Sequence, residues 1–405
     1  MSNPKALLLE NIDPIAVELL STAGFEVESV KGALDGAELD AALEGVRVLG
    51  IRSKTHLTGD LLRRHADLAA VGAFCIGTNQ IDLAAAAATG IAVFNAPFSN
   101  TRSVVEIALA EIISLARRLV DRDRALQAGV WDKSSAGSHE VRGRTLGIVG
   151  YGNIGSQLSV LAETLGMRVL FYDLEDKLAL GNAEPCKSLD ELLERSETVT
   201  LHVDGRAGNA GMFGAEQFAR MPRRSLFLNL SRGFVVDHDA LRENILSGHL
   251  AGAAIDVFPD EPKSQGDPFV STLRGLPNVI LTPHVGGSTQ EAQHDIGRFV
   301  AGKLIDFTRH GTTTLSVNLP TVSLHGTSPA RFGLLHRNVP GVLARADEVV
   351  GRYGLNVDGQ VLSTRGEVGY ALTDVNRPVP AELLAELEAL PETIRLLGYA
   401  GAVVG

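Results

Sequence analysis

The sequence is poor in cysteine, and the two cysteines that it has lie far apart. Cys75 and Cys186 are the only ones in 405 residues, so a disulfide framework is not expected and a reducing cytoplasm is favoured over secretion. Long apolar runs are also missing, since none approaches the roughly 20 residues needed to cross a bilayer. The apolar run 6–9 ends at once with Glu10. It is therefore expected to be a first β-strand and not a signal peptide.

Positive charge is scarce as well. The chain has 37 Lys and Arg against 48 Asp and Glu, which gives a net charge of -11 and argues against non-specific binding to nucleic acid. An anionic substrate would need a local cluster of cations. The chain is 45% hydrophobic and 21% charged, as expected of a globular protein that holds two or three domains at this length.

Residues 5–98 alternate between short apolar runs and helical patterns. The run 46–51, for example, suits a buried parallel strand. A long amphipathic helix is expected over 104–119, and Ser103 with Glu106 has the form of a capping box at its start. The pattern predicts an α/β domain followed by a helix that leads into a second one.

The composition changes near residues 311–330, where glycine, proline and threonine indicate turns and a linker. The remaining residues, 331–405, have a β-α-β-β-α-β pattern. Its strands are expected at 331–336, 355–363, 368–373 and 394–398, and its helices at 341–353 and 380–390. This order predicts a small ferredoxin-like domain.

A glycine-rich loop lies between an apolar strand at 144–149 and a helix expected at 156–165. The loop residues that concern a cofactor are Gly150, Gly152, Asn153, Ile154 and Gly155. Glycines in this pattern permit a tight turn, the approach of a pyrophosphate and close helix–strand packing, while the helix N-terminus supplies N–H donors. Asp173 ends the next strand, where a carboxylate would accept hydrogen bonds from ribose hydroxyls. Because it would repel a 2′-phosphate, NAD is predicted over NADP.

Three residues further along carry the groups needed to oxidise the hydroxyl of a 2-hydroxy acid. Arg232 can hold a carboxylate with two hydrogen bonds, and His284 can move a proton near neutral pH. Glu261 can orient that imidazole and favour its charged form. Each alone could be an ordinary loop residue. Together, behind the glycine-rich loop, they predict a dehydrogenase with His284 as general base and no metal site.

The sequence resembles the D-isomer-specific 2-hydroxyacid dehydrogenase family over nearly its whole length. The motifs that carry the resemblance are Gly150-Tyr151-Gly152-Asn153-Ile154-Gly155, Leu201-His202-Val203, Ser231-Arg232-Gly233, Ala254-Ile255-Asp256-Val257-Phe258, Asp260-Glu261-Pro262 and the run 283–292. The resemblance implies that Arg232, Glu261 and His284 are the catalytic set. It also implies that further residues contact NAD, with Ser231 and Asp256 at its nicotinamide end; the others are Leu230, Val285, Gly286 and Gly287.

The resemblance implies three functional domains. A flavodoxin-like α/β substrate-binding domain would be discontinuous, formed by residues 1–101 and 289–318. A Rossmann-type NAD-binding domain would occupy residues 102–288. A linker at 319–330 would lead to a ferredoxin-like ACT regulatory domain at 331–405.

The loop after the strand at 46–51 places Arg52, Ser53 and Lys54 at a strand's carboxyl end, where ligands gather in open α/β sheets. The resemblance implies that these residues and Asn100 contact the substrate, including its phosphate. Asn79 would lie on a loop against the carboxylate side. It also implies that Lys133 reaches the site of a neighbouring subunit, in a homodimer or homotetramer.

The C-terminal domain carries candidate effector residues. The resemblance implies that ACT domains bind L-serine with His336, Asn338 and Asn356, and amide and imidazole groups suit an amino acid. Arg337 between His336 and Asn338, and a longer tail at 398–405, depart from the family pattern.

The family members most like this chain oxidise D-3-phosphoglycerate to 3-phosphohydroxypyruvate with NAD, the first step of L-serine biosynthesis. Feedback inhibition by L-serine and a side reduction of 2-oxoglutarate are expected from the same resemblance. Two alternatives stay open. One is a dehydrogenase for glyceric, lactic or 2-hydroxyglutaric acid, which removal of the substrate's phosphate would distinguish. The other is a non-enzymatic NAD sensor that regulates other proteins.

Overall fold

The structure is a computed structural model that describes residues 3–65, 67–262, 266–326 and 328–399. Contacts divide the chain into two compact units, Met1–Ser99 with Gln293–Gly405, and Asn100–Ala292. Within the described ranges, every helix is too short or too polar to cross a membrane.

The first unit begins with a parallel five-stranded sheet in the order β2-β1-β3-β4-β5. Its strands are β1 (Lys5–Leu8), β2 (Glu26–Ser29), β3 (Val46–Ile51), β4 (Ala70–Ala73) and β5 (Ala92–Asn95). Its helices are α1 (Pro14–Thr22), α2 (Gly36–Ala42), α3 (Gly59–Arg64), α4 (Leu83–Ala88) and, from later in the chain, α11 (Gln290–His310). This is the flavodoxin-like order that was predicted.

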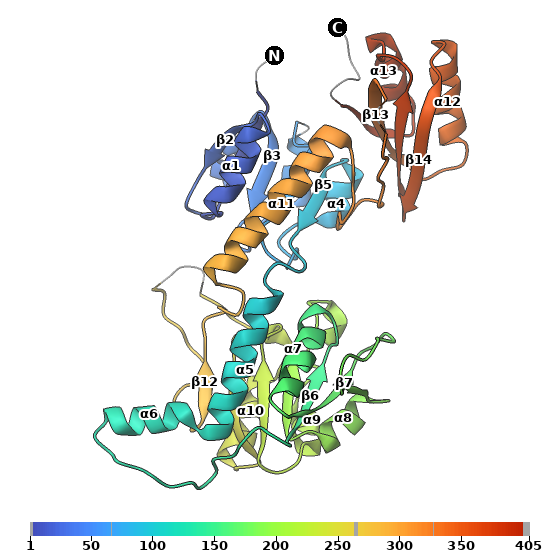
Figure 1. The fold of residues 1–405 in the computed structure, drawn as a ribbon. Helices are drawn as coiled ribbons and strands as arrows, with labels where there is room; N and C mark the ends of the chain where they lie inside the picture. Colours follow the sequence, from blue (N-terminus) through green and yellow to red (C-terminus); the bar gives the residue numbers. More distant parts are fainter. Residues whose placement is uncertain (1–2, 66, 263–265, 327, 400–405) are drawn as a thin grey trace. The chain divides into compact units, whose positions relative to one another are not determined.

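The long helix α11 returns the chain to this first sheet (Figure 1, orange). Its apolar side buries Val300, Leu304 and Phe307 in one core with Phe74 and Phe94 of the sheet. The segment after α11 continues along the same sheet, because Val317 N–H donates to the carbonyl of β5. The first unit is therefore assembled from two stretches far apart in the sequence.

The C-terminal part of the first unit is an antiparallel sheet in the order β14-β15-β13-β16. Its elements are β13 (Ala330–Arg337), α12 (Val342–Arg352), β14 (Val357–Arg365), β15 (Val368–Val375), α13 (Ala381–Glu388) and β16 (Thr393–Gly398). The β-α-β-β-α-β prediction is confirmed. The helices cover one face of the sheet (Figure 1), while Tyr370 and Leu335 face the core of the first sheet.

The segment expected as a linker is packed and not free. Leu319 and Val322 are both 1% exposed and belong to the core that the two sheets of the first unit share. Residues 400–405 of the tail lie outside the described residues.

The second unit is a parallel seven-stranded sheet in the order β12-β11-β10-β9-β6-β7-β8. Its strands are β6 (Thr145–Val149), β7 (Arg168–Tyr172), β8 (Glu184–Pro185), β9 (Thr198–Leu201), β10 (Ser225–Asn229), β11 (Leu250–Ile255) and β12 (Val279–Leu281). Its helices are α5 (Thr101–Arg117), α6 (Leu119–Gln127), α7 (Asn153–Thr164), α8 (Leu189–Arg195), α9 (Ala215–Arg220) and α10 (His238–Leu246). The predicted Rossmann-type sheet is confirmed, and β6, the strand that precedes the glycine-rich loop, lies inside it between β9 and β7.

The predicted helix over 104–119 is present as α5, which begins at Thr101 and ends at Arg117, but the capping box predicted at Ser103 is wrong. Arg118, with φ of +53°, ends α5 and separates it from α6. The hydroxyl of Ser103 pairs with that of Thr289 at 2.8 Å, and Glu106 accepts from Arg102 at 2.6 Å. A tertiary contact and an i,i+4 ion pair thus replace the expected local cap.

Candidate active site

The glycine-rich loop connects β6 to α7, and two of its glycines are required by close contacts. Gly150 has φ of +92°, and a Cβ there would lie 2.6 Å from the carbonyl oxygen of His202. A Cβ on Gly155 would lie 2.2 Å from the Gly150 oxygen. Gly152, by contrast, has no neighbour within 4 Å of such a Cβ. The turn and the helix packing use two glycines, and the third leaves the backbone open to a pyrophosphate at the helix N-terminus.

Asp173 lies immediately after β7 and turns toward this loop. Its Oδ2 accepts from the backbone N–H of Tyr151 at 2.8 Å, and its Oδ1 accepts from that of Glu175 at 3.1 Å. The side chain is half-buried. Since each carboxylate oxygen can accept more than one hydrogen bond, Asp173 keeps acceptor capacity for ribose hydroxyls beside the glycine-rich loop.

Arg232 lies in the turn after β10, which internal hydrogen bonds fix. The Asn229 side chain accepts from Ser231 N–H at 3.0 Å and donates to the Arg232 carbonyl at 3.0 Å. The Arg232 guanidinium donates to the Ser231 carbonyl at 2.7 Å. Next to it, a Cβ on Gly233 would lie 2.0 Å from the backbone carbon of Phe258. The turn therefore lies directly against the segment that leads to Glu261.

Glu261 and His284 form a hydrogen-bonded pair. Nδ1 of His284 lies 2.8 Å from Oε2 of Glu261, and the other oxygen of Glu261 accepts from the Phe258 N–H at 3.1 Å. The hydrogen bond that His284 donates to Glu261 raises the pKa of His284 against the effect of burial. Burial disfavours the Glu261 carboxylate, but the hydrogen bond and charge of His284 outweigh it and lower the pKa of Glu261.

The side chains of His284 and Glu261 remain 51% and 36% exposed. Solvent therefore screens this ion pair, and its contribution to folding stability is small. Its value lies in orientation, because Glu261 occupies Nδ1 and leaves Nε2 to face a reactant. The charge of Arg232 lowers the pKa of both partners, which places the guanidinium within electrostatic range of the pair.

Asp256, at the end of β11, organises the loop that carries His284. Its Oδ1 accepts from Thr282 Oγ1 at 2.6 Å and from Val285 N–H at 2.9 Å, and its Oδ2 accepts from Gly286 N–H at 2.9 Å. His284 itself has φ of +53°, a conformation that a residue with a side chain rarely adopts. The sequence suggested Asp256 as a cofactor contact, and the structure adds that it anchors this loop.

The carboxyl ends of these parallel strands meet at one edge of the second sheet. The glycine-rich loop follows β6, Arg232 follows β10, and His284 follows β12. Asn100 joins them, because its side-chain nitrogen lies 2.3 Å from the place of a Cβ on Gly287. Leu230 and Ser231 are buried on the same turn as Arg232. The structure therefore brings together the predicted catalytic and cofactor residues and Asn100.

The predicted phosphate loop belongs to the first unit. Arg52 is half-buried, and Ser53 and Lys54 are exposed, directly after β3. Two buried residues that the sequence did not suggest as site residues hold this loop: Glu10 accepts from its backbone N–H groups, and Gln80 donates to its backbone carbonyl. No local pattern signals either role, because both contacts join distant strands.

Asn79 is exposed on the loop that ends with Gln80. Lys133 is exposed after α6, between Asp132, which pairs with Arg122, and Ser134, whose carbonyl accepts from Arg122. Within the described residues, no hydrogen bond or ion pair joins Lys133 to another candidate site residue.

The candidate effector residues do not come together within one chain. His336 is 3% exposed and lies against Gly369. Asn338 donates from its backbone to Glu367, just before β15, whereas Asn356 accepts from Asn376, just after β15. The two asparagines are thus separated by the length of β15, roughly 23 Å at about 3.3 Å per residue. A single site that uses both would need two copies of the sheet.

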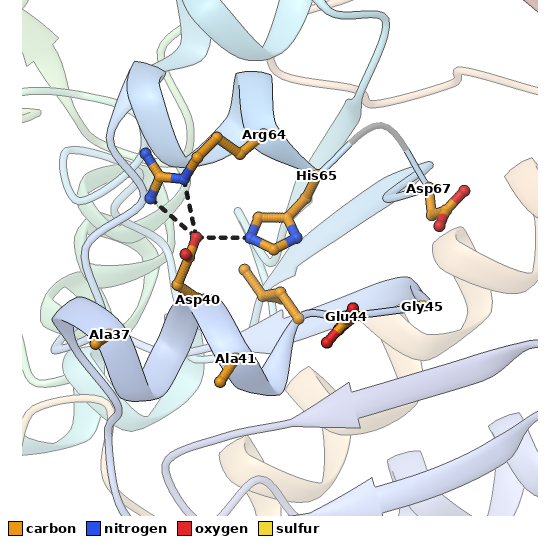
Figure 2. A pocket seen from close by; sticks show the side chains of 9 residues that line it. Ala37, Asp40, Ala41, Glu44, Gly45, Arg64, His65 and Asp67 are labelled. Atoms are coloured by element: carbon orange, nitrogen blue, oxygen red, sulfur yellow. Dashed lines mark hydrogen bonds and ion pairs between the residues drawn. The ribbon is translucent and has the colours of Figure 1, made fainter.

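A hollow of about 500 Å³ lies between α2 and α3 of the first unit. Figure 2 shows Asp40 there, accepting hydrogen bonds from Arg64 and His65. Gly45 immediately precedes β3, so the hollow lies at the amino ends of the parallel strands. Ligands of open α/β sheets bind at the carboxyl ends, and none of the candidate site residues lines the hollow.

Comparison with known proteins agrees with this geometry. Residues 109–286 match the model of the D-isomer specific 2-hydroxyacid dehydrogenase NAD binding domain. Residues 332–395 match the model of the AHAS small subunit-like ACT domain. The predictions of a Rossmann-type NAD-binding domain and of a C-terminal ACT domain are confirmed.

The similarity extends over nearly the whole chain. The D-3-phosphoglycerate dehydrogenase of Escherichia coli strain K12 is 48% identical over 394 residues, which cover 96% of each chain. D-3-phosphoglycerate dehydrogenase 1 of Saccharomyces cerevisiae is 44% identical and covers 97% of this chain and 87% of its own. Among solved structures, D-lactate dehydrogenase from Aquifex aeolicus, complexed with NAD and lactic acid, is 25% identical with a TM-score of 0.66, over 75% of this chain and 95% of that one. This chain belongs to the D-isomer specific 2-hydroxyacid dehydrogenase family.

Proposed function

We propose that this protein oxidises D-3-phosphoglycerate to 3-phosphohydroxypyruvate with NAD, the first step of L-serine biosynthesis. The relatives that match across nearly all of the chain carry the name of this activity. The single observation that supports it best is the His284–Glu261 pair, hydrogen-bonded at 2.8 Å on the sheet edge that also carries Arg232 and the glycine-rich loop. These groups can remove a proton from a hydroxyl that lies beside a carboxylate.

His284 takes the proton of the substrate hydroxyl at Nε2, since Nδ1 is hydrogen-bonded to Glu261. Glu261 holds the imidazole in place and stabilises the imidazolium that forms. Arg232 binds the substrate carboxylate and stabilises negative character on the reacting oxygen in the reverse direction. When bound, NAD supplies the acceptor for the hydride.

The loop from Gly150 to Gly155 would hold the pyrophosphate of NAD, and Asp173 would hold the adenosine ribose. Ser231 and Asp256 would face the nicotinamide end, with Leu230, Val285, Gly286 and Gly287 around it. Openness at Gly152 supports the pyrophosphate role, because a side chain there would fill the approach.

Substrate binding is proposed for the loop after β3 and for two asparagines. Arg52, Ser53 and Lys54 would bind the phosphate, and Asn79 and Asn100 would contact the rest of the molecule. The functional domains would be residues 1–101 with 289–318 for the substrate, 102–288 for NAD, and 331–405 for regulation. Reduction of 2-oxoglutarate would be a side activity of the same site.

A homo-oligomer is proposed from the exposed surface of α6 and the segment after it. On α6 and the following segment, Leu119, Leu126, Val130 and Trp131 are all more than half exposed, and such an apolar stripe favours contact with a second copy. Lys133 lies on the same segment and would reach the partner's site.

An L-serine site between two regulatory domains would also explain why Asn338 and Asn356 lie at opposite ends of β15. Each half-site would come from a different chain, with His336 of one copy alongside. Coupling of this kind is typically worth about 1–3 kcal/mol.

The proposed function is tested by following NADH formation from D-3-phosphoglycerate and NAD, with and without L-serine. The variant His284→Gln should lose at least about 10²-fold in kcat, while His139→Gln, an exposed histidine of the same unit, should retain activity. Turnover of D-glycerate, D-lactate or D-2-hydroxyglutarate in preference to D-3-phosphoglycerate would contradict the proposed substrate. NAD binding without turnover of any of these acids would favour a sensor.

A further inference from the structure

A buried carboxylate supports the loop that carries Arg52 and Lys54. Glu10 is 8% exposed, and its side chain accepts three backbone N–H groups of that loop, from Arg52 at 3.1 Å, Lys54 at 3.0 Å and Thr55 at 2.9 Å. Carboxylate oxygens accept without donating, so one side chain satisfies all three donors. Glu10 follows β1 and the loop follows β3, and these two strands are neighbours in the sheet.

The same loop is held from its carbonyl side. Gln80 is 3% exposed, and its Nε2 donates to the carbonyl of Arg52 at 2.6 Å and to that of Gly77 at 3.2 Å. Glu10 itself has φ of +65°, in the left-handed region that residues with side chains rarely adopt. The backbone is thus turned so that the carboxylate reaches the loop, and the loop is clamped at both its N–H and its C=O groups.

Clamping leaves the side chains of the loop available. Within the described residues, neither Arg52 nor Lys54 takes part in an ion pair. Glu10 already occupies three of the loop N–H groups that could otherwise hold an anion. The loop's side chains are therefore the main groups left to bind an anion, and in a chain with net charge -11 two unpaired cations on one fixed loop are a suitable cluster.

We propose that Glu10 is a positioning residue for the phosphate group of the substrate. By fixing the backbone of residues 52–55 it determines where the guanidinium of Arg52 and the ammonium of Lys54 meet the phosphate. This inference rests on the proposed function. Because charge-assisted hydrogen bonds to phosphate are directional, a displaced loop weakens phosphate binding without altering the groups that move the proton and the hydride.

The test compares a phosphorylated and an unphosphorylated substrate in the full-length protein. Glu10→Gln replaces one acceptor oxygen by an NH₂ group that faces an N–H donor. Its KM for D-3-phosphoglycerate should rise at least about tenfold, while kcat and the KM for NAD stay within about twofold of wild type. The kcat/KM for D-glycerate should be unchanged. Glu18→Gln, which alters an exposed carboxylate of α1 in the same unit, should leave every value unchanged.

Each outcome decides a different point. A wild-type protein that does not prefer D-3-phosphoglycerate over D-glycerate would overturn the proposed function, and with it the role of the loop in phosphate binding. A wild-type preference that Glu10→Gln retains would overturn only the inference. An equal loss with both substrates, or a loss in kcat, would also overturn it, because a general structural defect does not select for the phosphate.

Glu10→Gln removes an acceptor from a buried site, so a second variant is needed in case it does not fold. Gln80→Met removes the amide that holds the Arg52 carbonyl while keeping a side chain of similar length. It should cause the same selective rise in the KM for D-3-phosphoglycerate. A folded Gln80→Met protein with unchanged selectivity would contradict the clamped-loop argument.

Discussion

The substitution Glu111→Gln should stabilise the protein, increasingly so as the pH rises. Glu111 lies on α5 and is 4% exposed, and within the described residues neither of its carboxylate oxygens has a hydrogen-bond partner. Burial, and then the nearby charge of Asp256, raise the pKa of Glu111 to about 8. The side chain is therefore a neutral acid at neutral pH, and keeping it protonated costs folding free energy whenever the unfolded chain would ionise.

The size of the effect follows from the difference between the folded and unfolded pKa values. A raised pKa means that the contribution of Glu111 to stability is fully present below about pH 4.5 and is lost as the pH rises to about 8. At 1.36 kcal/mol per pKa unit, the loss is about 5 kcal/mol. Gln has nearly the same shape and stays neutral, so the variant escapes this loss.

The assay is urea unfolding of wild type and Glu111→Gln at about pH 5, 6.5 and 8, with the transition of the unit Asn100–Ala292 analysed. The two proteins should have similar free energies of unfolding at the lowest pH and diverge above it, with the variant more stable. Glu106→Gln on the same helix, at an exposed position, should show no such divergence. Parallel curves for wild type and Glu111→Gln at all pH values would refute the reasoning.

Three further predictions concern the second unit. Gly233→Ala puts a methyl group against the backbone after β11 and should cost about 1–3 kcal/mol of stability and about 10²-fold in kcat/KM. Gly208→Ala, with open space around it, is the control. Equal stability and activity of the two variants would contradict the packing argument. Glu261→Gln removes the negative charge that strengthens the hydrogen bond from His284 and helps raise the pKa of His284, so the acidic limb of the kcat/KM profile for oxidation should move to lower pH while the maximum falls about 10²-fold; an unmoved limb would show that Glu261 does not control the imidazole. Asp173→Asn should improve the ratio of NADP to NAD in kcat/KM at least about tenfold by removing a charge from the ribose site, and an unchanged ratio would exclude that role.

The sequence predicted well what depends on local spacing. The glycine-rich loop, Asp173 at the next strand end and the turn that carries Arg232 were all identified, because a strand, a turn and a helix in succession fix where their residues lie. The same reasoning failed at Ser103, where the pattern of a capping box was present. There the hydroxyl of Ser103 forms its hydrogen bond with Thr289, which is distant in sequence, and not with a backbone N–H of its own helix.

Prediction was poorest where function depends on the partners of a buried group. The effector candidates Asn338 and Asn356 are each plausible alone, yet strand register separates them along β15. Gln80 resembles any polar residue before an apolar run. Only the folded first sheet shows that its side chain donates a hydrogen bond to the carbonyl of Arg52. Such contacts carry no periodic signal in the sequence.

Three glutamates of this chain make the point in chemical terms. Glu10 accepts three backbone N–H groups, Glu261 accepts from His284 and from one backbone N–H, and Glu111 has no hydrogen-bond donor within the described residues. Identical side chains thus have different roles because the fold places different hydrogen-bond donors around them. The same exchange of glutamate for glutamine should therefore have three different results: lost phosphate selectivity, a displaced pH profile, and added stability at high pH. A common result at all three positions would mean that the arrangement of donors does not determine what these carboxylates do.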